Sequence, residues 1–290
     1  MKEQKFCYSF IIPHKNCPDL LQRCVDSIPE RDDVQVIVVD DNSDNEKKPA
    51  LKERKNLQVI LLDAEHSKGA GRARNVGLKN AEGKWLMFPD SDDYYNDEFL
   101  SILDKYINSS YDVIYFNFDY KDGKTGEKLT PLYFRNYFCE YDGKQESKDK
   151  IKFHHNVPWT KMVSHEYVNK YGISFEETIN GNDIFFSMMV GFYTNNIYVE
   201  NSPVYSYLRN QNSILTTKET VDSAMCRLEH LVKINYFYDY IGYAEWKNSV
   251  IKRILKKVYY SGFPFLCALV MNAKNIYKSR KEWVMIFDKR

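Results

Sequence analysis

The stretch Phe88-Pro89-Asp90-Ser91-Asp92-Asp93 decides the fold class of this 290-residue chain. It closes the apolar run of residues 84–88, which has the length of a strand, and it places two carboxylates, Asp90 and Asp92, where that strand ends. Carboxylate oxygens suit Mg²⁺ or Mn²⁺, and an ion held by them keeps coordination sites for a substrate phosphate. Acidic residues at a strand end also form turns and helix caps, so a simple turn is the alternative interpretation.

Apolar runs and helical patterns alternate on both sides of this stretch. The expected strands cover residues 6–12, 34–39, 57–62, 84–88 and 113–118, and the expected helices cover residues 18–28, 69–80 and 96–107. Strands that alternate with helices predict an α/β fold with a mostly parallel sheet flanked by helices. Ligands of such a sheet bind beyond the carboxyl ends of its strands.

After residue 119 the alternation stops. The pattern there predicts a charged hairpin or excursion at 121–150, helices at 159–169 and 183–193, and strands at 173–175 and 199–207. From residue 220 onward the spacing is helical, with breaks at Gly262 and Pro264. We therefore expect a main domain over residues 1–217 and a helical C-terminal region over residues 218–290.

The charge of the chain is balanced overall and uneven along its length. A net charge of +1 excludes a globally basic nucleic-acid binder. Residues 247–290 hold eleven Lys or Arg and two acids. This basic segment predicts contact with a polyanion or an anionic membrane, with solvated helices as the alternative.

The cysteine pattern and the N-terminus predict a cytoplasmic protein. The six cysteines form no C-x-x-C pair, which indicates reduced thiols. The N-terminal residues lead into a strand without the apolar run of a signal peptide, and no apolar run reaches the length of about 20 residues that spans a bilayer. Peripheral contact at the inner face of the cytoplasmic membrane stays open.

Two loops that follow strands carry candidate nucleotide contacts. Pro13 and His14 end the first strand, where they can frame a nucleotide or form an ordinary loop. Asp40 and Asp41 end the second strand, where a carboxylate can accept hydrogen bonds from a uracil N–H or a ribose hydroxyl. An Asx turn is the alternative for the second loop.

The glycine-rich stretch of residues 69–75 opens an expected helix. It lacks the last Gly or Ala of the G-x-G-x-x-G/A fingerprint and follows the third strand, which excludes a dinucleotide site of that type. Lys68 and Arg74 at a helix N-terminus still favour an anion. Alternatively, Arg74 braces the strand-end carboxylates as an ion pair.

Four pieces in fixed order resemble the inverting family 2 glycosyltransferases. They are residues 8–13, Val38-Val39-Asp40-Asp41-Asn42-Ser43, Gly71-Arg72-Ala73-Arg74-Asn75-Val76-Gly77 and residues 88–93. The resemblance is strong over residues 6–107 and weaker to about residue 215. It implies the GT-A fold, a Rossmann-like α/β sheet, here with a C-terminal helical extension.

The resemblance also implies roles for the strand-end residues. Asp40 or Asp41 would contact the uracil or ribose of the donor, Asp92 would bind a metal on the diphosphate, and Asp90 would contact ribose or a metal-bound water. The implied donor-binding residues are Pro13, His14, Asp40, Asp41, Lys68, Gly71, Arg74, Asp90 and Ser91, and the implied metal ligands are Asp92 and Asp90.

An inverting transfer needs a general base for the acceptor hydroxyl. The family usually supplies it from a Glu-Asp pair before an apolar helix, and this chain has Asn182 and Asp183 there. The resemblance therefore implies Asp183 as the base, while a helix N-cap is the alternative. Further implied contacts with the acceptor or diphosphate are Trp159, Lys161, Asn182 and Arg209.

The resemblance implies a metal-dependent hexosyl- or N-acetylhexosaminyltransferase that uses Mn²⁺ or Mg²⁺. The donor would be a UDP-sugar, and the acceptor a saccharide or lipid-linked hydroxyl in bacterial surface polysaccharide synthesis. A nucleotidyltransferase would need a glycine-rich phosphate loop after the first strand, and residues 13–17 have no glycine. A catalytically inactive sugar-nucleotide or glycan-binding module remains the alternative, and the basic C-terminal helices could contact a membrane or form a homodimer.

Overall fold

The computed structural model describes residues 5–130, 137–209 and 219–287, without the side chains of residues 261 and 277–287. The expected boundary at residue 217 and the segment 210–213 lie outside these ranges. The chain divides into two compact units. The N-terminal unit comprises Met1–Glu177 and Asn182–Ser213, and the C-terminal unit comprises Thr178–Gly181 and Ile214–Arg290.

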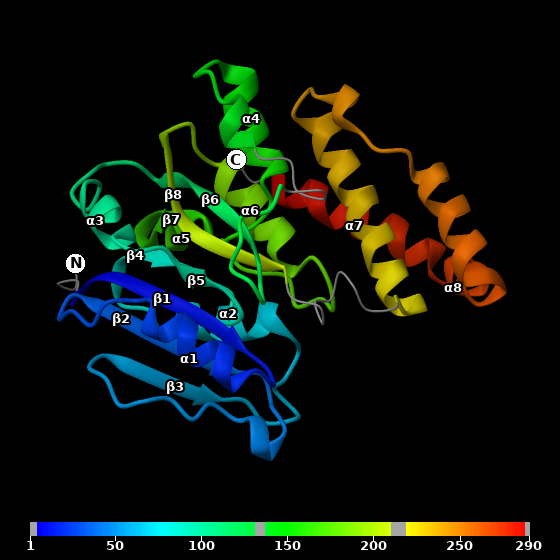
Figure 1. The fold of residues 1–290 in the computed structure, drawn as a ribbon. Coiled ribbons are helices and arrows are strands. Elements are labelled where there is room, and N and C mark those ends of the chain that lie inside the picture. Colours follow the sequence, from blue (N-terminus) through cyan, green and yellow to red (C-terminus); the bar gives the residue numbers. More distant parts are fainter. Residues whose placement is uncertain (1–4, 131–136, 210–218, 288–290) are drawn as a thin grey trace. The chain divides into compact units, whose positions relative to one another are not determined.

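A mixed eight-stranded sheet forms the centre of the N-terminal unit (Figure 1), in the order β3-β2-β1-β4-β7-β6-β8-β5. Its strands are β1 (Phe6–His14), β2 (Val34–Asp40), β3 (Leu57–Leu61), β4 (Gly83–Met87), β5 (Tyr94–Tyr95), β6 (Val113–Asp122), β7 (Lys161–Ser164) and β8 (Ile197–Arg209). The first four are parallel, β7 runs antiparallel to β4 and β6, and β8 is parallel to β6 but antiparallel to β5. This is the α/β architecture that the alternating pattern predicts.

Helices cover the sheet where the sequence has an apolar stripe. In the N-terminal unit they are α1 (Pro18–Asp26), α2 (Ala70–Asn80), α3 (Phe99–Asp104), α4 (Gln145–His154), α5 (His165–Tyr171) and α6 (Asn182–Phe192), with 3₁₀ turns at Asn45–Lys47 and Tyr137–Glu140. For example, α1 begins with a proline and buries Leu21, Cys24 and Val25 on one face.

The region between residues 119 and 175 differs from the sequence-based expectation. The stretch expected as one helix at 159–169 is the strand β7 followed by α5, which Ser164 caps by accepting the Tyr167 N–H at 3.3 Å. Ladder bonds to β4 and β6 on either side outweigh the helical spacing of β7. The expected strand at 173–175 was wrong, because these residues are not in a strand, and Phe175 instead stacks on Phe186 at 4.0 Å.

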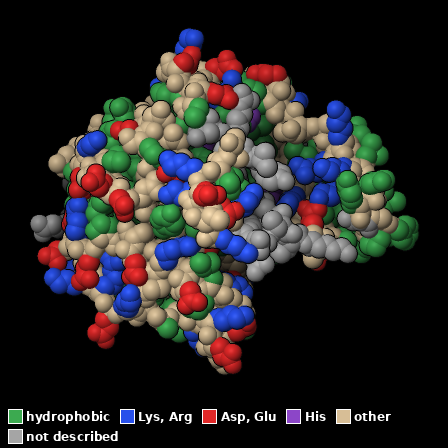
Figure 2. All heavy atoms as spheres, viewed as in Figure 1, with side chains coloured by type: hydrophobic (Ala, Val, Ile, Leu, Met, Phe, Trp, Pro, Cys, Tyr) green, Lys and Arg blue, Asp and Glu red, His purple; other side chains and the backbone are tan. Residues whose placement is uncertain are grey.

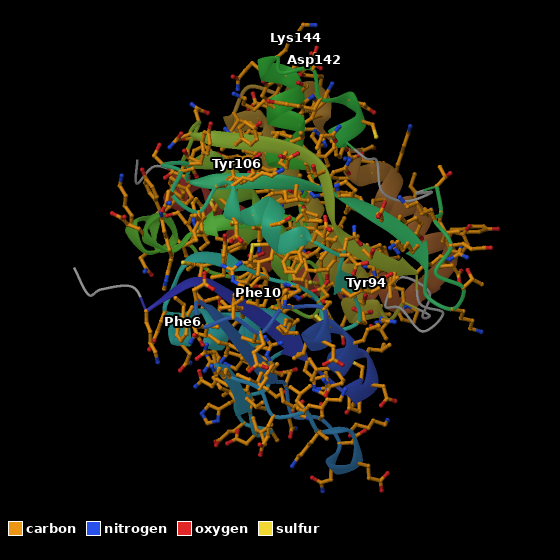
Figure 3. The ribbon with its side chains drawn as sticks, turned by 60° about the vertical axis from the view of Figure 1, so that its left-hand side comes forward. Phe6, Phe10, Tyr94, Tyr106, Asp142 and Lys144 are labelled. Carbon is orange, nitrogen blue, oxygen red and sulfur yellow. The ribbon has the colours of Figure 1, made fainter. Side chains whose placement is uncertain are left out.

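The core of the N-terminal unit centres on β1 and β2. Every residue of β2 is buried, as expected for a strand covered on both faces. Phe10, labelled in Figure 3, lies on β1. Its ring packs edge-on against Tyr95 and Phe99 at centroid distances of 5.4 and 5.9 Å. The parallel register places His14 opposite Asp40, so the carboxyl ends of β1 and β2 meet at one edge.

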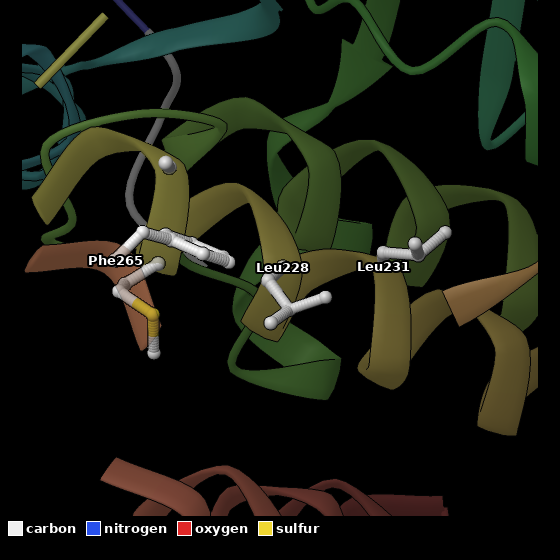
Figure 4. Close-up of a cluster of buried hydrophobic side chains, with 5 residues drawn as sticks. Leu228, Leu231 and Phe265 are labelled. Carbon is white, nitrogen blue, oxygen red and sulfur yellow. The ribbon is translucent and has the colours of Figure 1, made fainter. Parts of the chain in front are cut away.

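The C-terminal unit is built from α7 (Val221–Tyr240), a 3₁₀ turn (Ala244–Trp246) and α8 (Val250–Phe287). Its core is a cluster of α7 side chains around Phe265 of α8 (Figure 4). The backbone of α8 is non-helical at Gly262, where φ is 63°, and Pro264 follows two residues later. Among the described helices, none has the length and apolar character to cross a membrane.

Candidate active site

A buried His–Asp pair joins the ends of β1 and β2. His14 Nδ1 lies 2.8 Å from Asp40 Oδ1, and both side chains are fully buried. His14 Nε2 accepts the Cys17 N–H at 3.2 Å, which places the proton on Nδ1 as donor to Asp40. Ser43 donates to both oxygens of Asp40, from its hydroxyl at 2.5 Å and its N–H at 3.0 Å. Asp40 therefore holds the loop after β2 together.

The second acid of this loop, Asp41, fixes the start of α2. Its carboxylate accepts the N–H groups of Lys68 and Gly69 at 3.1 and 3.0 Å. The Lys15 ammonium lies 3.5 Å from the same carboxylate. These bonds bring the chain that precedes α2 to the carboxyl end of β2, while the Lys68 side chain stays largely exposed.

Arg74 braces the two acidic segments of the site. Its buried guanidinium donates from Nη1 to Asn182 Oδ1 at 2.7 Å and from Nη2 to Asp90 Oδ1. Arg74 thus forms the ion pair with a strand-end carboxylate that the sequence analysis gave as its alternative role. One cation thus connects the loop after β4 to the first turn of α6.

Gly71 lets α2 approach the chain that precedes α6. A Cβ atom at this position would lie 2.0 Å from the Glu176 carbonyl oxygen and 2.9 Å from Asn182 Cβ. Only a residue without a side chain fits between these backbones. The glycine expected in the donor site therefore has a packing role that keeps Arg74 beside Asn182.

The four residues Asp90 to Asp93 differ in exposure. The Asp90 side chain is 30% exposed and Asp92 is partly exposed, so both acids can be reached from solvent. The Asp92 carbonyl oxygen accepts from Arg23 Nη2 at 2.6 Å, and Ser91 is buried against Cys17 with 3.3 Å between hydroxyl and thiol. The loop after β4 is thus anchored at Ser91 and Asp92.

Asp93 is a positioning residue that the sequence analysis did not single out. It is fully buried and accepts the Tyr205 hydroxyl at 3.1 Å and the Leu208 N–H at 2.8 Å. The Tyr205 oxygen in turn accepts the Asp90 N–H at 3.0 Å. Burial, with the charges of Asp92 and Asp90 added, raises the pKa of the Asp93 carboxyl well above its usual range. The third acid of the run was the only signal in the sequence.

Asp183 lies in the first turn of α6 beside this network. Burial raises the pKa of its carboxyl, the Arg74 cation opposes that rise, and the Asp90 carboxylate adds to it. A carboxylate whose pKa is raised in this way can take a proton from a hydroxyl. Asp183 has the Arg74 guanidinium and the Asp90 carboxylate among its charged neighbours.

Trp159 and Lys161 are both buried, which differs from an exposed contact with an acceptor. Trp159 is 2% exposed and stacks on Tyr205 and Tyr207 at 4.9 and 5.5 Å. The Lys161 ammonium donates to the carbonyls of His155, at 2.7 Å, and Val157. Trp159 therefore supports β8 from within the core.

The ion pair of Arg209 is with Asp122, which is not one of the residues bonded to Arg74. Its guanidinium is half exposed and pairs with Asp122 at 2.9 Å. The structure thus brings Arg74, Asp90 and Asn182 together by direct bonds, whereas Lys68 and Arg209 project toward solvent.

Residues 9–172 match the model of glycosyl transferase family 2. The chain belongs to this family. Its relatives include the poly(ribitol-phosphate) β-N-acetylglucosaminyltransferase TarS of Staphylococcus aureus, 36% identical over 32% of this chain and 17% of that protein. The Escherichia coli UDP-Glc:α-D-GlcNAc-diphosphoundecaprenol β-1,3-glucosyltransferase WfaP is 34% identical over 30% of this chain and 36% of that protein. The putative Bacillus subtilis glycosyltransferase EpsH is 22% identical over 71% of this chain and 62% of that protein.

Solved structures support the fold of this family 2 chain. The crystal structure of residues 1–349 of S. aureus TarS with UDP-GlcNAc superposes with a TM-score of 0.58 and 22% identity. The superposition covers 78% of this chain and 66% of that one. The sheet and its flanking helices are therefore of the GT-A type expected from the sequence.

The acids of this family 2 chain do not form a complete metal cage. Within residues 5–130, 137–209 and 219–287, no group of three or more His, Cys, Asp or Glu is placed to hold a metal ion. Asp90 and Asp92 offer carboxylate oxygens that solvent can reach. This set fits an Mg²⁺-like ion that takes its remaining ligands from phosphate and water, and it does not fit an all-protein site.

Lys161 is expected to make the stability of the protein rise with pH. Burial lowers the pKa of its ammonium to about 7, although the Asp183 charge acts in the opposite direction. Between about pH 7 and the unfolded pKa of about 10.4, the unfolded chain binds more protons. From about pH 7 to 9, the wild type should therefore gain about 2 kcal/mol of unfolding free energy relative to Lys161→Met.

Urea unfolding of both proteins across this pH range measures the effect. The exposed Lys79 provides a matched control, because Lys79→Met removes the same group without any burial. The free energies of unfolding of wild type and Lys79→Met should change in parallel from about pH 7 to 9. The same parallel behaviour of wild type and Lys161→Met would contradict the lowered pKa of Lys161.

Proposed function

We propose that this protein is an inverting glycosyltransferase that moves a hexosyl or N-acetylhexosaminyl group from a UDP-sugar to a hydroxyl of a saccharide or lipid-linked acceptor. The observation that carries the proposal is the Arg74 guanidinium, which bonds both Asp90 after β4 and Asn182 beside Asp183. In this proposal Asp90 serves the donor diphosphate, and Asp183, next to Asn182 in the chain, takes the acceptor proton. The named activities of TarS and WfaP support a UDP-sugar donor and a role in bacterial surface polymers.

The reaction would proceed as a single displacement. The acceptor oxygen attacks the anomeric carbon, the bond from that carbon to the diphosphate oxygen breaks, and the configuration inverts. The hydroxyl proton passes to the Asp183 carboxylate, whose raised pKa makes it a stronger base than an ordinary aspartate. The Arg74 cation offsets part of the rise in the Asp183 pKa that burial causes.

The donor would lie along the edge where the strands end. The N-terminus of α2 is proposed to contact the nucleoside, and Lys68 is proposed to reach the diphosphate from its exposed position. Asp41 is buried and would hold the start of α2 in place through the Lys68 and Gly69 N–H groups. Pro13, His14 and Asp40 are buried, and they are proposed to support this edge from below. Ser91 would hold the loop that presents Asp90 and Asp92.

Asp90 and Asp92 are the residues that would hold a divalent cation, either Mg²⁺ or Mn²⁺. Such an ion, when bound, neutralises charge that develops on a departing nucleoside diphosphate. Arg74 limits Asp90 to the oxygen that the guanidinium leaves open. Asp92, the second acid of the D-x-D step, is the main proposed ligand.

Thermal unfolding with nucleotides tests the donor site. UDP with Mn²⁺ or Mg²⁺ should raise the melting temperature by about 5 °C at a hundredfold excess over Kd, since binding to the folded state stabilises by about 2.7 kcal/mol. GDP, CDP and ADP should shift it less, and EDTA should reduce the UDP effect.

The variant Asp92→Asn serves as the control for the metal. It should keep the melting temperature of the apo protein but lose the metal-dependent part of the UDP shift. A panel in which no nucleotide shifts the melting temperature would reject the transferase. Binding of UDP-sugar without any donor hydrolysis or transfer would favour the catalytically inactive module. The presence of Asn182 where the family usually has Glu is the feature of the sequence that favours this alternative.

A further inference from the structure

The outward face of α8 carries large apolar side chains that solvent reaches. Ile251, Leu255 and Tyr259 recur every four residues and are 71%, 64% and 82% exposed. Residues at this spacing share one face of a helix. Val250 and Ile254 occupy the other face, where they pack on the α7 cluster. The first half of α8 thus has one apolar face that builds the core and one that does not.

The second half of α8, after the kink at Gly262, repeats this division. Phe265 is fully buried in the cluster with α7. Phe263, Val270 and Met271 are 74%, 72% and 80% exposed. We name the α8 outer face as the exposed residues Ile251, Leu255, Tyr259, Tyr260, Phe263, Val270 and Met271. Figure 2 shows hydrophobic side chains gathered in the α8 region at the right of the view, with Lys and Arg side chains beside them.

Basic side chains lie along the α8 outer face. Lys252 and Lys256 are exposed one residue after Ile251 and Leu255, so a basic stripe runs beside the apolar one. Arg253 and Lys274 are also exposed, and residues 247–276 contain no Asp or Glu. Two copies of this face would bring charges of the same sign together, which disfavours self-association.

We propose that the α8 outer face binds the surface of an anionic lipid bilayer. Apolar and aromatic side chains would enter the headgroup boundary, where tyrosine is favoured, and the lysines would contact lipid phosphates. The α8 outer face is apolar and aromatic and has only basic charges beside it, which matches the acyl chains and phosphates of an anionic bilayer. A protein partner would need an acidic patch and an apolar patch in the same arrangement. This binding goes beyond the proposed transferase and does not depend on it, since lipid binding requires no donor or acceptor.

Vesicle flotation of the full chain tests this proposal. We expect the protein to float with vesicles of phosphatidylcholine and phosphatidylglycerol, and much less with phosphatidylcholine alone, at about 0.1 M salt. The double variant Lys252→Glu/Lys256→Glu should lower the partition coefficient about tenfold or more. Leu255→Ser/Tyr259→Ser should cause a similar loss through the apolar stripe.

A matched control separates the α8 face from general charge effects. Lys52 and Lys55 are exposed in the N-terminal unit, and Lys52→Glu/Lys55→Glu makes the same charge change there. This control should float like the wild type, and circular dichroism should show all variants folded.

Three results would overturn the proposal. The wild type could fail to float with anionic vesicles, or the Lys52/Lys55 control could lose flotation as strongly as the α8 variant. The third result combines two observations: the wild type does not bind vesicles, and light scattering finds a dimer that Leu255→Ser/Tyr259→Ser converts to a monomer. This result would assign the α8 outer face to contact with a second copy of the chain.

Discussion

Changing Asp183 to Asn is expected to lower kcat by a factor of about 10² to 10⁴, the usual contribution of a general base. The amide keeps the shape of the side chain but cannot accept the acceptor proton. UDP binding should stay nearly unchanged, because the proposed nucleotide contacts lie on the segments after β3 and β4 and not on α6. Release of UDP from UDP-GlcNAc or UDP-glucose with an acceptor measures kcat, and the thermal shift with UDP measures binding.

The pH profile adds a second readout for Asp183. Activity should fall as pH drops through the pKa of the Asp183 carboxyl, and burial places that limb above the range of an ordinary aspartate. Asp222→Asn is the matched control, since Asp222 also lies in the first turn of a helix but is exposed. Turnover of Asp183→Asn close to that of Asp222→Asn would remove Asp183 from the role of base.

Changing Asp93 to Ala is expected to lower the free energy of unfolding by about 2 to 6 kcal/mol. The substitution leaves two buried donors, the Tyr205 hydroxyl and the Leu208 N–H, without an acceptor, and each such loss costs about 1 to 3 kcal/mol. Asp93→Asn should cost less, because its oxygen still accepts the Leu208 N–H and only the Tyr205 hydroxyl loses its acceptor. Urea unfolding measures both.

The raised pKa of Asp93 adds a pH dependence to this comparison. A carboxyl that holds its proton more tightly when folded stabilises most below the unfolded pKa of about 3.9 and loses that stabilisation as pH rises through its folded pKa. The wild type should therefore lose stability relative to Asp93→Asn as pH rises from about 4. Asp97→Ala, an exposed change on the other side of β5, should cost less than about 0.5 kcal/mol. An Asp93→Ala protein as stable as Asp97→Ala would contradict the buried role.

The N-terminal strands could be predicted because their signal is local. The apolar residues 34–39 form a strand buried on both faces, and the structure extends it only to Asp40. β2 and β4 end within one residue of the expected positions. The expected end of the first strand at residue 12 was wrong, because Pro13 and His14 stay in β1, paired with Val39 and Asp40 of β2. Periodicity and turn chemistry act over a few residues, so a single sequence contains them.

The middle of the chain could not be predicted in the same way. A charged hairpin or excursion was expected over residues 121–150, yet residues 145–154 form α4 with Ile151 and Phe153 buried. Lys152 is buried there too, because its ammonium donates to Asn195 Oδ1 at 2.9 Å. A partner forty-three positions away makes this burial possible, and no local pattern announces it.

The sequence by itself determined the α/β alternation and the acids at the strand ends, because both follow from short-range patterns. Only the tertiary structure decided which of these acids is fully buried and which keeps part of its side chain exposed to solvent. Asp40 is buried by His14 and Ser43, while Asp90 keeps part of its carboxylate exposed beside Arg74. Arg74 meets Asn182 across 108 residues of chain. Burial and charges that come from distant parts of the chain depend on how the elements pack, and they raise the pKa of Asp183, the proposed base.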